Sequence, residues 1–363
     1  MIRIATIGTS IISDCLIEVL NASPRATYVG TCSRDAGRAE AFTRDHGGVR
    51  PFTSLDELTA SDEVDAVYIG SPNALHACQA LACIAGGKHV LVEKAFCANR
   101  REAAEVFDAA EAAGVVALEA MRPVHDPAFW AVRDALPQLG RLRRATLRFG
   151  KYSSRYDEIL AGRRTNIFDC AMASGALMDI GVYTVEPMIA LFGMPDRTTC
   201  AAALLGEETR VITNGAIDGA GVITASYSGM VATAQYSKVT NDLAPSQFEG
   251  ELGTLTVDAI STPSQARVDL RASKGGDTVG YSGIDTAARE LELPHVSNTM
   301  AYELDDFIAA VEAAQAGTPA PEAAAGSFGT VGYFRDLTLN TMALMDEARR
   351  QTGIVFPADG RVA

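Results

Sequence analysis

Residues 2–33 have the sequence IRIATIGTSIISDCLIEVLNASPRATYVGTCS, in which two apolar runs flank a segment with helical spacing. Residues 2–8 and 26–33 are predicted to be strands, and residues 14–22 a helix between them. Strands joined through a helix pair in parallel and are buried on both faces, which explains their continuous apolar character. This stretch therefore predicts the first β-α-β unit of a parallel sheet.

The same alternation continues to residue 121. Further strands are predicted at residues 64–72, 89–94 and 115–121, and helices at residues 35–47, 74–87 and 101–114. Five β-α steps in about 120 residues are typical of a doubly wound sheet. We expect residues 1–121 to form one domain of the α/β class.

The pattern changes after residue 122. Residues 141–150, 220–228, 229–237 and 250–258 alternate apolar and polar side chains between glycine-rich turns. Such alternation predicts a large, mainly antiparallel, open-faced sheet. Helices predicted at residues 174–193, 299–317 and 328–353 would flank this sheet, and one late helix could pack back on the first domain. The fold class is thus α/β plus α+β, with a second domain at residues 122–363; residues 318–326 are the expected mobile stretch.

Composition and charge exclude several classes of function. The 363 residues carry 45 acidic and 31 basic side chains, and a net charge of −14 repels nucleic acid, which favours a small-molecule partner. The first eight residues lack the pattern of a signal peptide, and no run of about 18 uninterrupted apolar residues occurs, so we expect a cytoplasmic protein that does not enter a membrane. The seven cysteines are scattered, which predicts neither a disulfide framework nor a metal site.

The loop after the first strand lies where dinucleotide-binding folds carry G-x-G-x-x-G. Gly8 matches the first glycine, whereas Ser10 and Ser13 occupy the second and third positions. Such a loop lets the backbone turn tightly and approach a pyrophosphate at a helix N-terminus. The alternative is an ordinary β-α turn capped by Ser10 or Ser13.

The end of the second strand bears on which nucleotide would bind. NAD-binding folds usually end this strand with an acidic residue that binds the ribose hydroxyls, whereas NADP sites offer a cation there. This chain has Ser33 followed by Arg34, whose guanidinium suits a phosphate, so NADP(H) is favoured over NAD(H). Asp35 argues for NAD(H) if the register shifts by one residue, and Arg34 could also be a solvated loop cation.

Five motifs in this order and spacing resemble the glucose-fructose oxidoreductase and inositol dehydrogenase family (Gfo/Idh/MocA). They are IGTSIIS (residues 7–13), SPNALH (71–76), VLVEKAF (90–96), EAMRPVHDP (119–127) and SGALMDIGVY (174–183). The resemblance covers nearly the whole chain and is nearest to the dimeric dihydrodiol dehydrogenase-like branch. It implies a Rossmann-type first domain and a second domain that binds substrate and forms oligomers.

The resemblance also implies the catalytic residues. Lys94 takes the place of the lysine that meets the substrate oxygen, although a lysine at a strand end can also simply extend into solvent. Asp179 would bind a substrate hydroxyl, and Tyr183 stands where many members have a histidine that exchanges the proton. Asp179 and Tyr183 lie four apart, so a helix would place both on one face; the alternative is a helix-terminal carboxylate and a core tyrosine. Ala95 replaces the family's proline, and we expect its peptide bond to be trans.

The sequence therefore predicts an NAD(P)-dependent oxidoreductase. It would transfer a hydride between nicotinamide and a secondary alcohol or ketone, or a hemiacetal or lactone, of a sugar, polyol or cyclic diol, with no metal. The alternatives are a non-catalytic dinucleotide-binding sensor and an enzyme with permanently bound NADP(H). A homodimer or homotetramer would form through the second sheet, near Tyr227 and Tyr236. The predicted cofactor contacts are Gly8, Thr9, Ser10, Ile11, Ile12, Ser33, Arg34, Ser71, Pro72, Asn73, His76, Glu93, Lys94 and Arg122.

Overall fold

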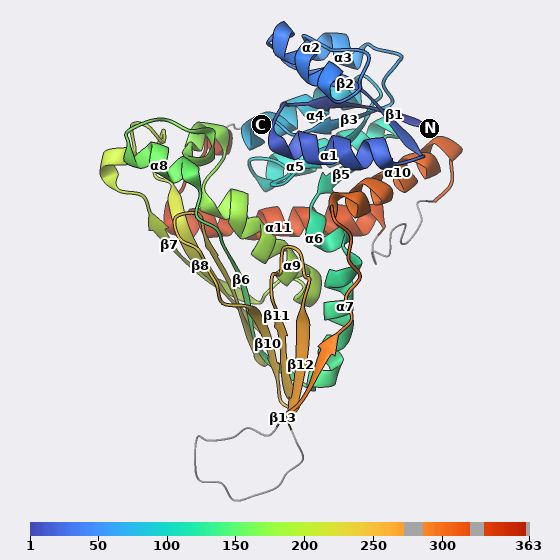
Figure 1. Ribbon diagram of the computed structural model, residues 1–363. Helices are drawn as coiled ribbons and strands as arrows, with labels where there is room; N and C mark the ends of the chain where they lie inside the picture. Colours follow the sequence, from blue (N-terminus) through green and yellow to red (C-terminus); the bar gives the residue numbers. More distant parts are fainter. Residues whose placement is uncertain (272–285, 320–329, 361–363) are drawn as a thin grey trace, which may run out of the picture.

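The structure is a computed structural model that describes residues 1–271, 286–319 and 330–360. Most of the expected mobile stretch, residues 318–326, lies outside the described residues. The described part contains two sheets (Figure 1), and a parallel sheet forms the upper layer in this view. The strand order of this first sheet is β2-β1-β3-β4-β5, so the doubly wound prediction is confirmed.

The elements of the first half follow the predicted order. The strands are β1 (Ile2–Ile7), β2 (Ala26–Cys32), β3 (Ala66–Ile69), β4 (His89–Glu93) and β5 (Ala117–Ala120), and the helices are α1 (Ile11–Ala22), α2 (Ala36–Asp45), α3 (Leu55–Thr59), the short 3₁₀ turn η1 (Asn73–Leu75), α4 (His76–Ala85) and α5 (Arg100–Ala113). Helix α1 begins three residues before the predicted residue 14, because Ser10 adopts the extended conformation of an N-cap. The prediction missed α3, a five-residue helix capped by the Ser54 side chain.

The second sheet has eight described strands in the order β13-β12-β11-β10-β6-β9-β8-β7. Its neighbours are antiparallel except for the parallel pair β6 and β9, which confirms a mainly antiparallel sheet. The strands are β6 (Leu142–Gly150), β7 (Arg197–Leu204), β8 (Asp218–Tyr227), β9 (Met230–Ser237), β10 (Ser246–Gly250), β11 (Gly253–Val257), β12 (Ala266–Arg271) and β13 (Thr286–Leu291). The predicted segment 250–258 proved to be the end of β10, a turn and β11.

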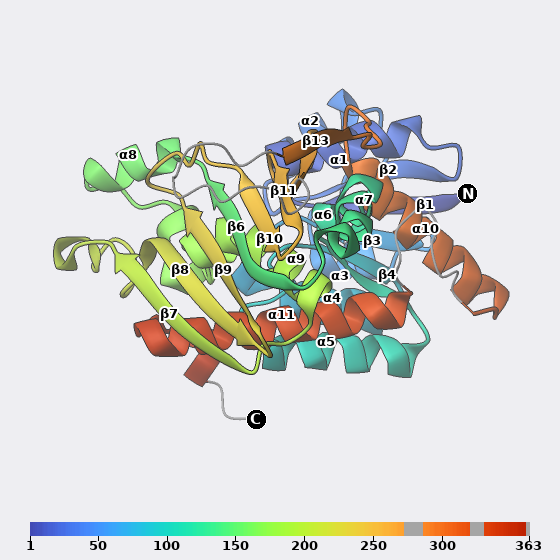
Figure 2. The ribbon, with the colours of Figure 1, turned by 90° about the horizontal axis from the view of Figure 1, so that it is seen from below.

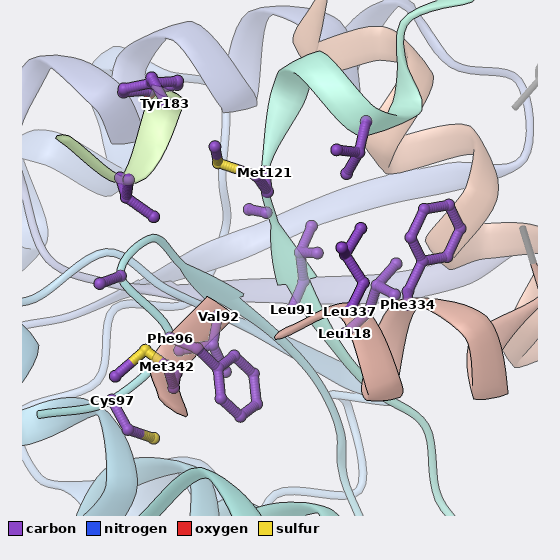
Figure 3. Packing of buried hydrophobic residues seen from close by; sticks show 14 of the residues in the cluster. Leu91, Val92, Phe96, Cys97, Leu118, Met121, Tyr183, Phe334, Leu337 and Met342 are labelled. Carbon is purple, nitrogen blue, oxygen red and sulfur yellow. The ribbon is translucent and has the colours of Figure 1, made fainter. Parts of the chain in front are cut away.

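Helices and short helical turns fill the rest of the second half. They are α6 (Arg122–His125), α7 (Pro127–Ala135), η2 (Leu136–Leu139), α8 (Ser154–Leu160), η3 (Asn166–Phe168), η4 (Cys170–Met172), the π-helical η5 (Leu177–Gly181), α9 (Val182–Phe192), η6 (Glu207–Thr209), α10 (Met300–Ala316), α11 (Val331–Thr352) and η7 (Pro357–Gly360). Helix α10 contacts α1, and α11 runs along α5 and β5 on one side and α9 and β7 on the other (Figure 2). In Figure 3, Leu91 and Leu118 of the parallel sheet lie beside Leu337 of α11. Helix α11 therefore packs against elements of both halves of the chain and connects their hydrophobic cores.

The second sheet has a covered face and an open face. Ala145 pairs with Ala232 and Phe248 on the covered face, which α9 packs against. The next residue, Thr146, pairs with Thr233 on the open face. One face is therefore apolar core, and the other carries mostly polar side chains, among them Arg144, Arg148 and Gln235.

The two tyrosines expected near an exposed apolar face do not lie exposed on it. Tyr236 is only 6% exposed, and its ring lies against Gly181 of η5. Tyr227 packs edge-on against Phe192, and its hydroxyl donates to the Gly193 carbonyl. Both rings are used in packing between the sheet and α9, which the alternating pattern alone could not reveal.

Residues 170–192 form the one described helical stretch that is long and apolar enough to cross a membrane. This stretch lies between the sheets, and 78% of its most apolar window is buried inside the protein. Such burial is what a core helix of a globular protein needs, because its apolar side chains already have protein partners.

Candidate active site

The turns after β1 and β3 meet at the carboxyl edge of the parallel sheet. Gly8 has φ +110°, and a Cβ atom there would lie 2.7 Å from the Gly70 carbonyl oxygen. Only glycine fits both the left-handed conformation and this close approach. Open parallel sheets bind ligands at this edge, and the turn leads directly into the N-terminus of α1.

A cavity of about 440 Å³ opens at this edge, between the two halves of the chain. It brings together ten of the predicted site residues: Ser10, Ile11, Ile12, Ser71, Pro72, Asn73, Glu93, Lys94, Asp179 and Tyr183. The second half contributes a further wall, namely Asn166, Ile167, Met172 and Ser174. Asn166 and Ile167 belong to the loop at residues 151–169, which was expected to shape the pocket, and Ser174 begins the last motif, whereas Met172 was missed. A larger hollow of about 800 Å³ lies on the second sheet, where its lining is mainly alanine, glycine and other small residues.

Asp179, which lines the cavity, lies between two lysines. The Lys94 ammonium donates to Asp179 Oδ1 at 2.8 Å and to the Asp179 backbone carbonyl at 2.9 Å. Lys238, which no motif singled out, donates to Asp179 Oδ2. Exposed fractions of the side chains are 12% for Lys94, 8% for Lys238 and 22% for Asp179, so these charges are largely shielded from solvent.

The charges in this cluster keep one another ionised. Burial alone would raise the pKa of Asp179, but Lys94 and Lys238 hold that pKa well below its usual range. Burial alone would lower the pKa of Lys94, yet the negative charge of Asp179 raises that pKa above its usual value. Lys94, Lys238 and Asp179 therefore sum to a charge of +1, without counting Glu93, which also lines the cavity.

Tyr183 stands beside Lys94, as the family resemblance implied. The Lys94 Nζ atom lies 5.1 Å from the centre of the Tyr183 ring, and Phe149 meets this ring edge-on. Arg122 lies near the tyrosine from α6. Burial lowers the pKa of Arg122, but Tyr183, Glu303 and Glu93 together raise it above its usual value. Lys94 and Arg122 thus both lie beside Tyr183.

Arg122 is absent from the lining of the first cavity, although it was predicted to contact the cofactor. It lines a second, polar cavity of about 530 Å³ together with Asp126, Asp258 and His295. Arg122 therefore stands between this second cavity and Tyr183, and acts on the first cavity through the tyrosine.

The peptide bond between Lys94 and Ala95 is cis, so the expectation of a trans bond was wrong. The general preference of non-proline residues is overridden here by a fully buried loop whose polar groups have specific partners. The Ala95 carbonyl lies 3.1 Å from His76 Nδ1, and the next amide, of Phe96, donates to Glu119 Oε1.

His76 and Glu93 have structural partners. His76 is fully buried, with Nε2 2.7 Å from the Ser71 carbonyl, and it tethers the turn after β3 to the loop after β4. Glu93 accepts a hydrogen bond from the Tyr68 hydroxyl at 2.6 Å; burial raises the pKa of Glu93. The adjacent residues Glu93 and Lys94 therefore do not pair with each other: Glu93 binds Tyr68, whereas Lys94 binds Asp179.

The end of β2 lies next to the end of β1, and Arg34 is exposed there. The Asp35 side chain accepts a hydrogen bond from the Arg38 amide and caps α2. Its carboxylate is thus occupied as a helix cap, which weakens the argument from Asp35 for NAD(H). Gly8, Thr9, Ser33 and Arg34 do not line the 440 Å³ cavity; they lie at the ends of these two adjacent strands or just beyond them.

Across residues 1–271, 286–319 and 330–360, no three His, Cys, Asp or Glu side chains gather so that they could hold a metal ion. Positive charge in the described cavity comes from lysines instead.

Two family descriptions match the chain. "Oxidoreductase family, NAD-binding Rossmann fold" matches residues 2–120, and "GFO/IDH/MocA C-terminal domain" matches residues 132–275. The chain is 35% identical to scyllo-inositol 2-dehydrogenase (NADP(+)) IolU of Bacillus subtilis (strain 168), over 99% of each chain. It is 32% identical to trans-1,2-dihydrobenzene-1,2-diol dehydrogenase of Homo sapiens, over 53% of this chain and 56% of that protein.

A solved structure shares the whole architecture. It is that of KijD10, a 3-ketoreductase from Actinomadura kijaniata in complex with NADP and TDP-benzene. The TM-score is 0.78 over 97% of this chain and 98% of that chain, at 24% identity. At this identity the likeness shows the fold.

Proposed function

Because the chain belongs to the GFO/IDH/MocA oxidoreductase family, we propose that it transfers a hydride between NADP(H) and a CH-OH or keto carbon of a sugar, polyol or cyclic diol. The observation that carries this proposal is the convergence of Lys94, Asp179 and Tyr183 in one cavity at the carboxyl edge of the parallel sheet. These side chains come from β4, η5 and α9, so a packing accident is a poor explanation for their meeting.

The residues at the carboxyl edge of the parallel sheet fit a dinucleotide. The Gly8 turn allows close backbone approach, and Ser10 occupies the N-cap of α1 without a side-chain cap bond. Backbone amides at the start of a helix suit a pyrophosphate. The exposed Arg34 suits the additional phosphate of NADP(H), and the B. subtilis relative is an NADP(+) enzyme by name.

When bound, the nicotinamide supplies or accepts the hydride. The chain supplies the proton chemistry: Tyr183 Oη accepts the proton of the substrate hydroxyl during oxidation and returns it during reduction. Lys94 stabilises the negative charge that develops on the substrate oxygen. Asp179 retains unused lone pairs with which it accepts a hydrogen bond from a neighbouring substrate hydroxyl.

We also propose a division of labour within the chain. Residues 1–121 would bind the nucleotide, and residues 122–363 would bind the substrate. The open, threonine-bearing face of the second sheet would associate with a second copy in a homodimer or homotetramer, and the protein would work in the cytoplasm.

The test is a titration followed by a substrate panel. Reduced-nicotinamide fluorescence is recorded while NADPH and NADH are added; turnover is then measured at the absorbance band of reduced nicotinamide with scyllo-inositol, other polyols, aldoses and cyclic diols. We expect tighter binding of NADPH and NADP⁺-dependent oxidation of at least one vicinal diol. NADPH binding without turnover would favour a non-catalytic sensor, and a nucleotide spectrum in the purified protein would favour a permanently bound cofactor. Absence of binding would refute the interpretation of the first loop.

A further inference from the structure

Lys238 reaches the candidate active site from the second sheet. It follows β9 directly, and its ammonium group donates to Asp179 Oδ2 while Lys94 takes Oδ1. The two lysines therefore approach the same carboxylate from different sheets. The chain has only five lysines against 26 arginines, which makes the meeting of two lysines at one carboxylate notable.

The backbone around Lys238 is held on both sides. Its amide donates to the Gly219 carbonyl at 2.8 Å, and its carbonyl accepts from the Ser153 amide at 2.9 Å. With the main chain fixed in this way, the side chain extends inward and is only 8% exposed. A long side chain that loses this much rotamer freedom and solvent contact needs a compensating partner, and Asp179 is that partner.

We propose that Lys238 is a positioning residue for the hydride-transfer reaction, which it serves by fixing and charging the Asp179 carboxylate. This inference rests on the proposed function. With Lys94 alone, the carboxylate could rotate about its side-chain bonds and follow one ammonium group. With a second ammonium group on the other oxygen, the plane of the carboxylate is fixed, and its remaining lone pairs keep one direction for a substrate hydroxyl.

Lys238 also sets the sign of the local charge. Lys94 and Asp179 by themselves sum to zero, whereas Lys94, Asp179 and Lys238 sum to +1. A net positive site favours the negative charge that develops on the substrate oxygen as the proton leaves. Lys238 would therefore contribute to turnover without touching the reacting carbon.

The charged groups facing this cluster can be named element by element. Asp179 on η5 faces Lys94 after β4 and Lys238 after β9. Lys94 also faces Tyr183 on α9 and Glu93 on β4. Removal of the Lys238 charge leaves Asp179 with one cation, so its carboxylate should become easier to protonate and the acidic limb of the rate profile should move to higher pH.

The experiment compares Lys238→Met, which keeps the length and removes the charge, with Lys238→Arg, which keeps the charge. The matched control is Lys88→Met. Lys88 is also buried, but it directly precedes β4, and its ammonium group donates to the backbone carbonyls of Ser61 and Val64 and not to Asp179. We expect Lys238→Met to lower kcat by about 10-fold to 100-fold, the loss typical of removing a group that orients a functional residue. KM should change much less than kcat. The acidic limb of the pH–rate profile should move to higher pH, and Lys238→Arg should recover part of kcat.

Lys88→Met should lower stability but leave kcat and the pH profile unchanged. A purely structural Lys238 would behave in the same way as Lys88, and that result would overturn the proposal. NADPH binding, measured by fluorescence, should be equal in all variants.

A second measurement keeps the inference independent of the substrate panel. Unfolding of Lys238→Met, Asp179→Asn and the double variant forms a double-mutant cycle that needs no turnover. Coupling between the two positions is expected, and additive effects would overturn the inference. An active wild-type enzyme with an unaffected Lys238→Met refutes the role of Lys238 alone, whereas an inactive wild type with clear coupling refutes the proposed function alone.

Discussion

Substitution of Asp179 by asparagine should destabilise the protein by an amount that follows from the burial of its partners. The change leaves two ammonium groups, on side chains 12% and 8% exposed, without their anion. Breaking a buried ion pair from one side costs about 3–5 kcal/mol. Asp179 itself is 22% exposed, and Lys94 keeps its bond to the backbone carbonyl of residue 179, so we expect a loss near the lower limit, about 3 kcal/mol.

The pH dependence of this loss has a definite sign. The folded protein holds the pKa of Asp179 below the ordinary carboxyl value of about 4. A lowered pKa gives stability that is fully present above the unfolded value and disappears as the pH falls through the folded value. The free-energy difference between wild type and Asp179→Asn should therefore be constant from pH 8 to pH 5 and shrink only below about pH 4.

The assay is urea unfolding followed by the fluorescence of Trp130, the sole tryptophan, which is 1% exposed near the start of α7. The control is Glu251→Gln, which breaks an exposed pair with Arg143 and should cost less than about 1 kcal/mol. A loss in Asp179→Asn no larger than this control would refute the interpretation of the cluster as a buried charge network. So would a difference between wild type and variant that vanishes already at pH 6.

Three further outcomes are expected. Tyr183→Phe should lower kcat by about 100-fold or more and leave the NADPH dissociation constant unchanged, as steady-state kinetics and fluorescence titration would show, because only the proton-transfer group is lost. Arg34→Ala should weaken NADPH binding by roughly tenfold and NADH binding little, as calorimetry would show, because a surface guanidinium contact to phosphate is removed; equal losses for both nucleotides would contradict that role. Gly8→Ala should abolish NADPH binding in the same titration, since its Cβ atom would lie 2.7 Å from the Gly70 oxygen; wild-type affinity would show that the turn does not hold the nucleotide.

Much of the fold could be predicted because the determining signals are local. Apolar runs and helical spacing identified every strand of the parallel sheet, since these strands are buried on both faces. Three strands of the second sheet, β7, β12 and β13, were missed, and β10 was missed apart from its last residue. β7 and β13 form the edges of the sheet. β7 consists mostly of small residues, so its sequence pattern barely differs from that of a loop.

Only those site residues that belong to the quoted sequence motifs could be predicted. Asp179 and Tyr183 lie one helical turn apart, so local structure brings these two together. Lys94 is 85 residues from Asp179, and only the family resemblance associated it with them. Lys238 is 59 residues from Asp179 in sequence, and only the closure of the second sheet over η5 brings it there. The cis bond at Ala95 likewise depends on His76 and Glu119, which belong to other elements.

The measurement that tests the central claim most directly follows the hydride itself. NADPH carrying deuterium at the transferable position of the nicotinamide is incubated with the protein and a cyclic polyol ketone, and the product is examined by mass spectrometry. The account predicts one deuterium bound to the product carbinol carbon with wild type and almost none with Tyr183→Phe. A protein that binds this nucleotide but transfers no deuterium to any ketone of the panel would contradict the claim that the cavity at Lys94 is the active site of an oxidoreductase.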